Sequence, residues 1–364
     1  MQSEDYLEPD TDNNDETTKR LSGKGVWLWL HAITFLVGLS LLTWLIYNYW
    51  EQVRQSVLNV GWGFLIVVGL NITRHLLRAL TMYRAVDPAH RTFKYRSAVA
   101  ARFGGEAVNF FTFTGPFLGD ATKAILLKKN VSITQSASAV IIDNVLYYIT
   151  VILVVLAGVA ILLAQYDSTG STMSRVLFGI VIVAIVMLAG LVLAMMYRFK
   201  PLTYLIKQLN KRGVAPSFIL KKKDTFESVE SNVFHFYHDR RADFFSVFGI
   251  SMITHCVSVT EVFLLLKLLG NVPFVSTAFI IESLTKVINA SFSFIPGTIG
   301  AYEGGNGIIL RTLGYTTATG IALALVRRGA ILFSTFIGCI ILLWRTAEGG
   351  AKRLKENKNK TLER

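Results

Sequence analysis

Repeated apolar runs constrain this chain more than any other feature. Several runs of about 20 or more mostly apolar residues follow one another, and an α-helix of that length crosses the roughly 30 Å hydrocarbon core of a bilayer. The chain has 364 residues and is 52% hydrophobic. A soluble domain of this length would instead alternate apolar and polar faces. The runs predict an all-α polytopic membrane protein.

Some of these runs are continuous and others are interrupted. The six predicted full spans cover residues 26–50, 57–82, 136–164, 176–197, 244–269 and 317–344. The stretches 97–127 and 274–312 break near their middles, at "FTGPFLG" and "FIPGTIG". Proline removes a backbone donor, and broken backbone is tolerated at membrane depth only where protein or water covers it. Each stretch predicts a re-entrant helical hairpin, although two crossings at each break would preserve the same topology. The predicted hinge residues are Gly115, Pro116, Gly119, Pro296, Gly297 and Gly300.

The net charge of +13 is divided by segment. Residues 1–25 are acidic and poor in apolar residues, which predicts a disordered tail. The connecting segments 83–96 and 198–241 and the tail 346–364 are basic. The positive-inside rule places such segments, and with them both termini, on the cytoplasmic side of a cell membrane. The aromatic and basic loop 198–241 is expected to lie on the anionic leaflet. This distribution is typical of membrane topology and argues against a nucleic-acid partner.

The single membrane domain, 26–345, divides into two similar parts, 26–164 and 176–345. An offset of 180 residues aligns Asn109 with Asn289 and Pro116 with Pro296. Charged residues also align, with opposite sign: Arg102 with Glu282, Glu106 with Lys286, Lys123 with Glu303 and, at an offset of 184, Asp143 with Arg327. Three spans in each part invert the second relative to the first, as in many secondary transporters. Chance alignment of membrane sequence is the alternative.

Ionisable residues at membrane depth are costly and usually meet a partner or a cavity. Arg102 and Glu106, like Glu282 and Lys286, are four residues apart and are expected to form intramembrane ion pairs. Arg327 and Arg328 fall about ten residues into the last span, and guanidinium groups suit phosphate. The predicted substrate-binding residues are Arg327, Arg328, Glu303, Lys123, Asp120, Asp143, Asn109 and Asn289.

Smaller expectations accompany this assignment. Glu303 is expected to pair with Arg327 or to bind a cationic headgroup, and a half-helix after Pro296 is expected to aim backbone N–H groups at an anion. Arg74 and Arg78 are expected to snorkel to the headgroups from the end of the second span. No partner is assigned to Glu261.

Several kinds of site have no counterpart in the sequence. It has no Walker A loop, no HExxH motif and no GxSxG motif. His235 and His238 alone are too few ligands for a metal site. The sequence therefore predicts neither a catalytic residue nor a metal or other cofactor.

Two motifs resemble the flippase-like integral membrane family, also called the lysylphosphatidylglycerol synthase transmembrane region, which includes the membrane half of the multiple peptide resistance factor. The first runs from "NFFTFTGPFLGDATK" to "IIDN" and the second is "FIPGTIGAYEGG" followed by "ALVRRGAIL". The first departs from the family pattern at Phe117, Leu118, Lys123 and Ile142. The aminoacyl-transferase domain of the resistance factor is absent here, so any lipid synthesis would need a separate enzyme.

The resemblance implies movement of lipids or lipid-linked intermediates between leaflets. We therefore expect a flippase or scramblase, not an enzyme, whose partners are anionic or phosphate-bearing membrane lipids. Two alternatives stay open. One is a membrane-embedded enzyme or accessory subunit that modifies lipids or lipid-linked sugars, and the other is an ion-coupled transporter of a small anion.

Overall fold

The computed structural model describes residues 36–37, 39–112, 116–128, 131–165, 172–212, 220 and 222–362. Within these ranges every regular element is helical. The predicted disordered tail 1–25 and the predicted hinge Gly115 lie outside the described residues. The elements are η1 (Gly61–Gly63), α2 (Phe64–Ala85), η2 (Pro88–His90), α3 (Tyr95–Phe111), α4 (Pro116–Lys128), α5 (Ile133–Gln165), α6 (Thr172–Met196), α7 (Pro201–Lys211), α9 (Lys223–Asp239), α10 (Arg241–Leu268), α11 (Val275–Ser291), η3 (Pro296–Thr298), α12 (Ala301–Thr312) and α13 (Thr317–Leu362).

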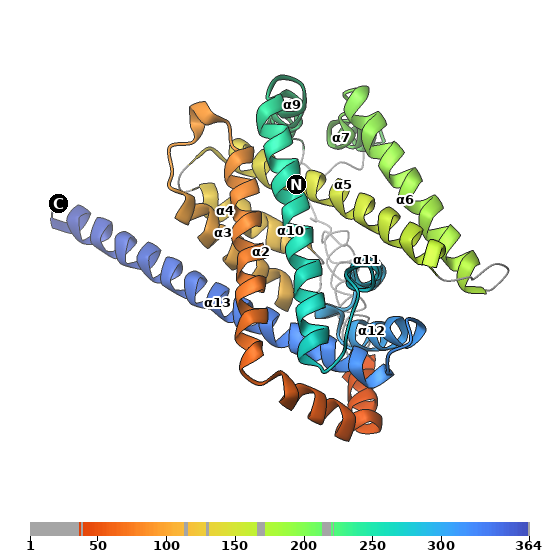
Figure 1. The fold of residues 1–364 in the computed structure, drawn as a ribbon. Coiled ribbons are helices and arrows are strands. Elements are labelled where there is room, and N and C mark those ends of the chain that lie inside the picture. The colour runs from red at the N-terminus through yellow and green to blue at the C-terminus, as the bar shows by residue number, and fades with distance from the viewer. Residues whose placement is uncertain are drawn as a thin grey trace, which may run out of the picture.

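Five helical segments of the described chain are long and apolar enough to cross a membrane, so the protein is a multi-pass membrane protein. They are Leu39–Ala85, Ile133–Gln165, Ser174–Met196, Arg241–Leu268 and Thr317–Arg345. The prediction of six spans differs at the N-terminal end, where the first two fall within Leu39–Ala85. The chain bends there at Gly61, whose φ is 46°. The segment before the bend turns away below α2, where Leu45 contributes to an apolar cluster with Ile321 of α13 (Figure 1).

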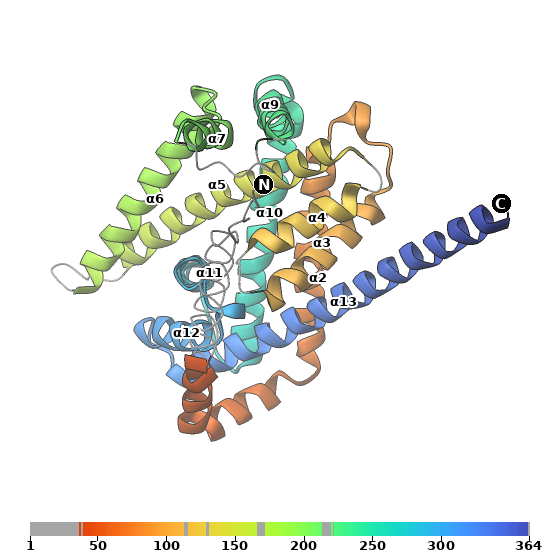
Figure 2. The same ribbon diagram turned by 180° about the vertical axis from the view of Figure 1, so that it is seen from behind.

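Helices α2 and α10 lie side by side at the centre and run in opposite directions (Figure 1). Helix α3 contacts α2, α4 and α13, while α11 contacts α10, α12 and α5. Figure 2 shows from behind that α3 and α4 lie beside the long α13. Helix α6 is peripheral and contacts α5.

Both predicted helix breaks occur where the sequence placed them. Helix α3 ends at Phe111 and α4 begins at Pro116, while α11 ends at Ser291 and α12 begins at Ala301. In the second break Gly297 and Gly300 have φ values of 57° and 78°, which glycine adopts at little cost.

Gly119 is not a hinge, contrary to the prediction. It lies inside α4, and a Cβ there would come within 2.7 Å of the Gly105 carbonyl oxygen on α3. The absence of a side chain therefore lets α3 and α4 approach closely.

Two apolar clusters are separated by a polar layer along the central helices. On α2, Val67 belongs to one cluster and Ala79 to the other. Between them lie the buried Asn71 and the polar residues Arg74 and His75. Buried polar groups are costly unless they are paired, so this layer is the natural place to look for a functional site.

Candidate functional site

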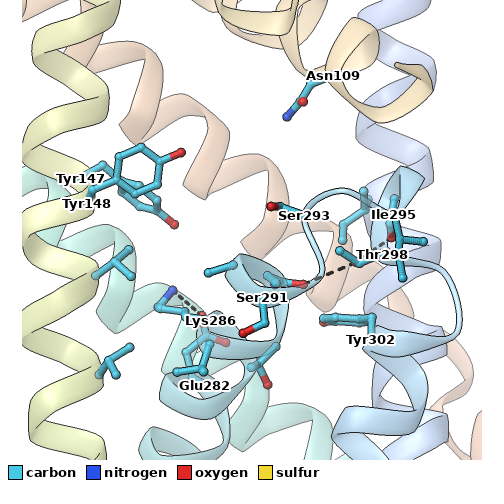
Figure 3. Close-up of a pocket in the computed structure, with 18 of the residues that line it drawn as sticks. Asn109, Tyr147, Tyr148, Glu282, Lys286, Ser291, Ser293, Ile295, Thr298 and Tyr302 are labelled. Carbon is cyan, nitrogen blue, oxygen red and sulfur yellow. Dashed lines mark hydrogen bonds and ion pairs between the residues drawn. The ribbon is translucent and has the colours of Figure 1, made fainter. Parts of the chain in front are cut away.

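A cavity of about 1000 Å³ opens within the polar layer. Its walls come from α2, α3, α5, α6, α11 and α13, together with the loop 292–300 that joins α11 to α12. Figure 3 shows Asn109 of α3, Tyr147 and Tyr148 of α5 and Lys286 of α11 directed toward one space. The cavity thus combines side chains from both parts of the chain.

One wall of the cavity is apolar and faces outward. Val176, Val183 and Met187 of α6 line it and are each more than half exposed. Val151 and Val155 of α5 continue the same surface inward. A ligand with an apolar tail can therefore contact this wall while its polar end lies deeper.

The deeper wall carries Arg327, held between two carboxylates. Its Nε lies 3.1 Å from Glu261 and its Nη2 lies 2.9 Å from Glu282. Arg74 of α2 also approaches Glu261, at 3.4 Å. Arg327 Nη1 is buried and has no hydrogen-bond partner among the described residues. One donor of this arginine is therefore left for a ligand or a water molecule.

Arg328 joins the cavity to the second helix break. Its Nε donates to Glu303, and its Nη1 donates to the Gly297 carbonyl at 3.0 Å. The guanidinium lies over the Tyr302 ring, with its carbon 5.6 Å from the ring centre. Glu303 also accepts from the Gly300 backbone N–H, at 2.8 Å. Arg328 therefore fastens the loop to α13 while it lines the cavity.

Lys286 supplies a further cation on the α11 side. Its Nζ lies 2.8 Å from Glu282, as the spacing of four residues predicts. An ammonium has three donors, so this pair leaves hydrogen-bonding capacity on the cavity side.

A second cavity of about 260 Å³ adjoins the first and shares Arg74, His75, Glu106, Asn109, Tyr147 and Tyr148 with it. Lys123 of α4 lines it and lies 2.8 Å from Glu106 and 2.9 Å from Asp120. Asn144 donates to Asp120 at 2.7 Å. The predicted pair of Arg102 and Glu106 forms here, at 3.0 Å.

Asp143 lies behind this smaller cavity and is almost completely buried. Arg78 donates to it at 2.7 Å, Arg102 approaches at 3.8 Å, and Thr81 donates from α2. The ring of Tyr147 lies 3.7 Å from the Arg78 guanidinium carbon, which adds a cation–π contact.

The charged groups of the two cavities and their direct partners do not balance. Seven cations face six carboxylates, so the network has an excess of positive charge. The cations are Arg74, Arg78, Arg102, Lys123, Lys286, Arg327 and Arg328, and the carboxylates are Glu106, Asp120, Asp143, Glu261, Glu282 and Glu303. An anionic ligand would complete this balance.

The structure brings most of the predicted substrate residues to the two cavities. Arg327, Arg328, Asn109 and Asn289 line the larger one, and Lys123 and Asp120 line the smaller. Glu303 and Asp143 stand behind the lining, bonded to residues in it or beside it.

Three expectations about individual residues are wrong. Glu303 pairs with Arg328 and not with Arg327, because Arg328 faces the start of α12. The backbone N–H of Gly300 is taken by Glu303 and is not free for an anion. Arg74 and Arg78 do not snorkel, since they reach Glu261 and Asp143 inside the protein.

The sequence analysis missed Tyr147 and Tyr148. These residues follow Asp143 by one helical turn, and that spacing places at least one of them near the same face of α5. Glu261 had no assigned partner because Arg327 is 66 residues away in the chain.

Comparison with protein families gives one match that covers most of the chain. The model described as "Lysylphosphatidylglycerol synthase TM region" matches residues 31–338. No curated protein and no solved structure matches the chain.

Proposed function

Since the chain belongs to the family of the lysylphosphatidylglycerol synthase TM region, we propose that it is a lipid translocase. Its substrate is a phospholipid or lipid-linked phosphate intermediate, whose headgroup enters the larger cavity while its tails stay in the bilayer. In this proposal the protein is a flippase or scramblase of the cell membrane and not an enzyme. Its partners are anionic or phosphate-bearing membrane lipids.

The observation that carries the proposal is the division of the larger cavity into an outward apolar wall and a charged interior. Val183 of α6 is 59% exposed while it lines the cavity. Arg327 and Arg328, on the opposite wall, are nearly buried. A small soluble anion would need only the charged interior, whereas a lipid uses both.

The phosphate is held by Arg328, Lys286 and the unpaired Nη1 of Arg327. A planar guanidinium offers two parallel N–H donors to a phosphate. Arg327 is already engaged by two carboxylates, so Arg328 and Lys286 are the more available cations. Asn109 and Tyr147 contact the remainder of the headgroup.

We further propose that the two parts of the chain are inverted repeats with swapped charges, and that each broken stretch is a re-entrant hairpin. Matching contacts support this. A Cβ at Gly158 of α5 would come within 2.3 Å of Ser283 on α11, and a Cβ at Gly338 of α13 would come within 2.3 Å of the Phe103 carbonyl on α3. Both members of the first pair differ from those of the second by 180 residues.

Both termini are proposed to be cytoplasmic. Helices α7 and α9 and the basic connection between α2 and α3 share one end of the molecule (Figure 1). Clustered Lys and Arg residues in short loops favour the cytoplasmic side.

The test is lipid transfer by the purified protein in liposomes. Fluorescent acyl-labelled lipids are exposed to an impermeant quencher, and the inner-leaflet pool is followed. We expect protein-dependent transfer of phosphate-bearing anionic lipids, with Arg328→Ala slower by about tenfold or more because a charged hydrogen bond is lost. Arg311→Ala, at the exposed end of α12, is the matched control. Absence of transfer for every lipid tested would refute the translocase.

A further inference from the structure

The loop 292–300 has an uncommon backbone conformation. Thr298 has a φ of 53°, and it lies between Gly297 and Gly300, whose φ values are also positive. A β-branched residue in this region is strained by about 1–3 kcal/mol and persists only where its surroundings hold it. Something outside the loop must therefore secure this conformation.

The securing contacts converge on Arg328. Within the loop, the Thr298 amide bonds the Ile295 carbonyl at 2.8 Å. From α13, Arg328 holds the Gly297 carbonyl, and through Glu303 it is linked to the Gly300 amide. One side chain thus reaches both sides of the strained residue.

The same side chain is open to the cavity. Arg328 is 12% exposed and lines the cavity beside Gly297 and Thr298. Its Nη2 makes no hydrogen bond to the described residues. A phosphate that binds there in the bidentate mode needs two adjacent N–H groups, and one of them must come from a nitrogen that now holds the loop.

We propose that Arg328 is a positioning residue through which a phosphate headgroup acts on the loop 292–300. Phosphate takes the guanidinium from Gly297 or Glu303, and the strained turn is then free to open. This inference rests on the proposed function, because it takes the transported headgroup as the ligand. It adds that headgroup binding and opening of the helix break are one event.

Hydrogen–deuterium exchange of the full-length protein in detergent tests the coupling. The reporting amides are Ile295, Thr298 and Gly300, each of which is hydrogen-bonded in the closed loop. The probe is dioctanoyl phosphatidic acid, and dioctanoylglycerol is its matched control without phosphate. We expect phosphatidic acid to raise exchange in 292–300 by about tenfold, the change for losing one charged hydrogen bond, and dioctanoylglycerol to leave it unchanged.

Variants separate positioning from simple support. Arg328→Gln is expected to exchange rapidly without lipid and to lose the response to phosphatidic acid. Arg328→Lys keeps the charge but not the fork, and is expected to respond only in part. Arg311→Gln should behave as the wild type. The wild-type response alone tests the proposal if a variant does not fold.

Two results would overturn the coupling. One is a wild-type loop whose exchange is unchanged or slowed by phosphatidic acid, and the other is an Arg328→Gln loop that exchanges like the wild type. Transfer in liposomes is scored separately. A loop response without any lipid transfer would refute the translocase and leave the coupling, whereas transfer without a loop response would refute the coupling alone.

Discussion

Asp143 on α5 and Arg327 on α13 occupy corresponding positions with opposite charge. Asp143 lies 3.8 Å from Arg102 on α3, and Arg327 lies 2.9 Å from Glu282 on α11. Each of the four residues meets its sign-reversed counterpart when the chain is offset by 180 to 184 residues. The ion pairs are thus built on one plan with exchanged charges, so each buried charge depends on a partner from a different helix.

Arg78→Leu is expected to lower the free energy of unfolding by about 3 kcal/mol or more, because it removes the closest cation from the buried Asp143. The double variant Arg78→Leu/Asp143→Asn should recover most of this loss, since no unpaired charge is left. Thermal unfolding in detergent measures both. Equal stability of the wild type and Arg78→Leu would contradict the ion-pair interpretation.

Gly338→Ala is expected to destabilise the protein by about 1–3 kcal/mol, because its Cβ would lie 2.3 Å from the Phe103 carbonyl. Gly190→Ala on α6 is the matched control, since no atom lies within 4 Å of its Cβ position. That change should be neutral or stabilising by up to about 1 kcal/mol through helix propensity. Similar melting temperatures for the two variants would argue against the close approach of α13 and α3.

Val183→Trp is expected to reduce lipid transfer by about tenfold, because the indole fills the apolar part of the larger cavity and the substrate loses its contact there. Val186→Trp adds the same bulk to an exposed position of α6 that does not line the cavity. It should transfer lipid normally. Folding is checked by size-exclusion chromatography. Equal transfer by both variants would show that the α6 wall does not contact the substrate.

Helix α7 is expected to lie at the membrane surface. Tyr204 and Leu205 are exposed while Ile206 is buried, and Lys207 and Lys211 are basic. Such a helix places its apolar side chains in the headgroup region. A spin label at Leu205→Cys, after replacement of Cys256 and Cys339 by serine, should be more accessible to oxygen than to a water-soluble nickel reagent. The opposite ratio would place α7 in water.

Local features of the site could be predicted from the sequence. The breaks after Phe111 and Ser291 follow from proline and glycine, and the pairs Arg102–Glu106 and Glu282–Lys286 follow from helical periodicity. These depend on neighbours in the chain and on little else.

Partner choice between helices could not be predicted. Arg327 and Arg328 point about 100° apart on α13, and only the rotation of that helix decides which of them meets Glu303. That rotation is determined by packing against α3, α12 and α2, over long sequence separations. The number of spans differed for a similar reason, because apolar length does not reveal that the chain turns at Gly61.

The exposed wall of α6 has a consequence for inhibition. A lipophilic compound can reach the larger cavity sideways from the bilayer, past Val176, Val183 and Met187, without passing through an aqueous mouth. Its effective concentration is then the concentration in the membrane. Potency across a chemical series should accordingly follow partitioning into lipid as closely as it follows fit to the cavity.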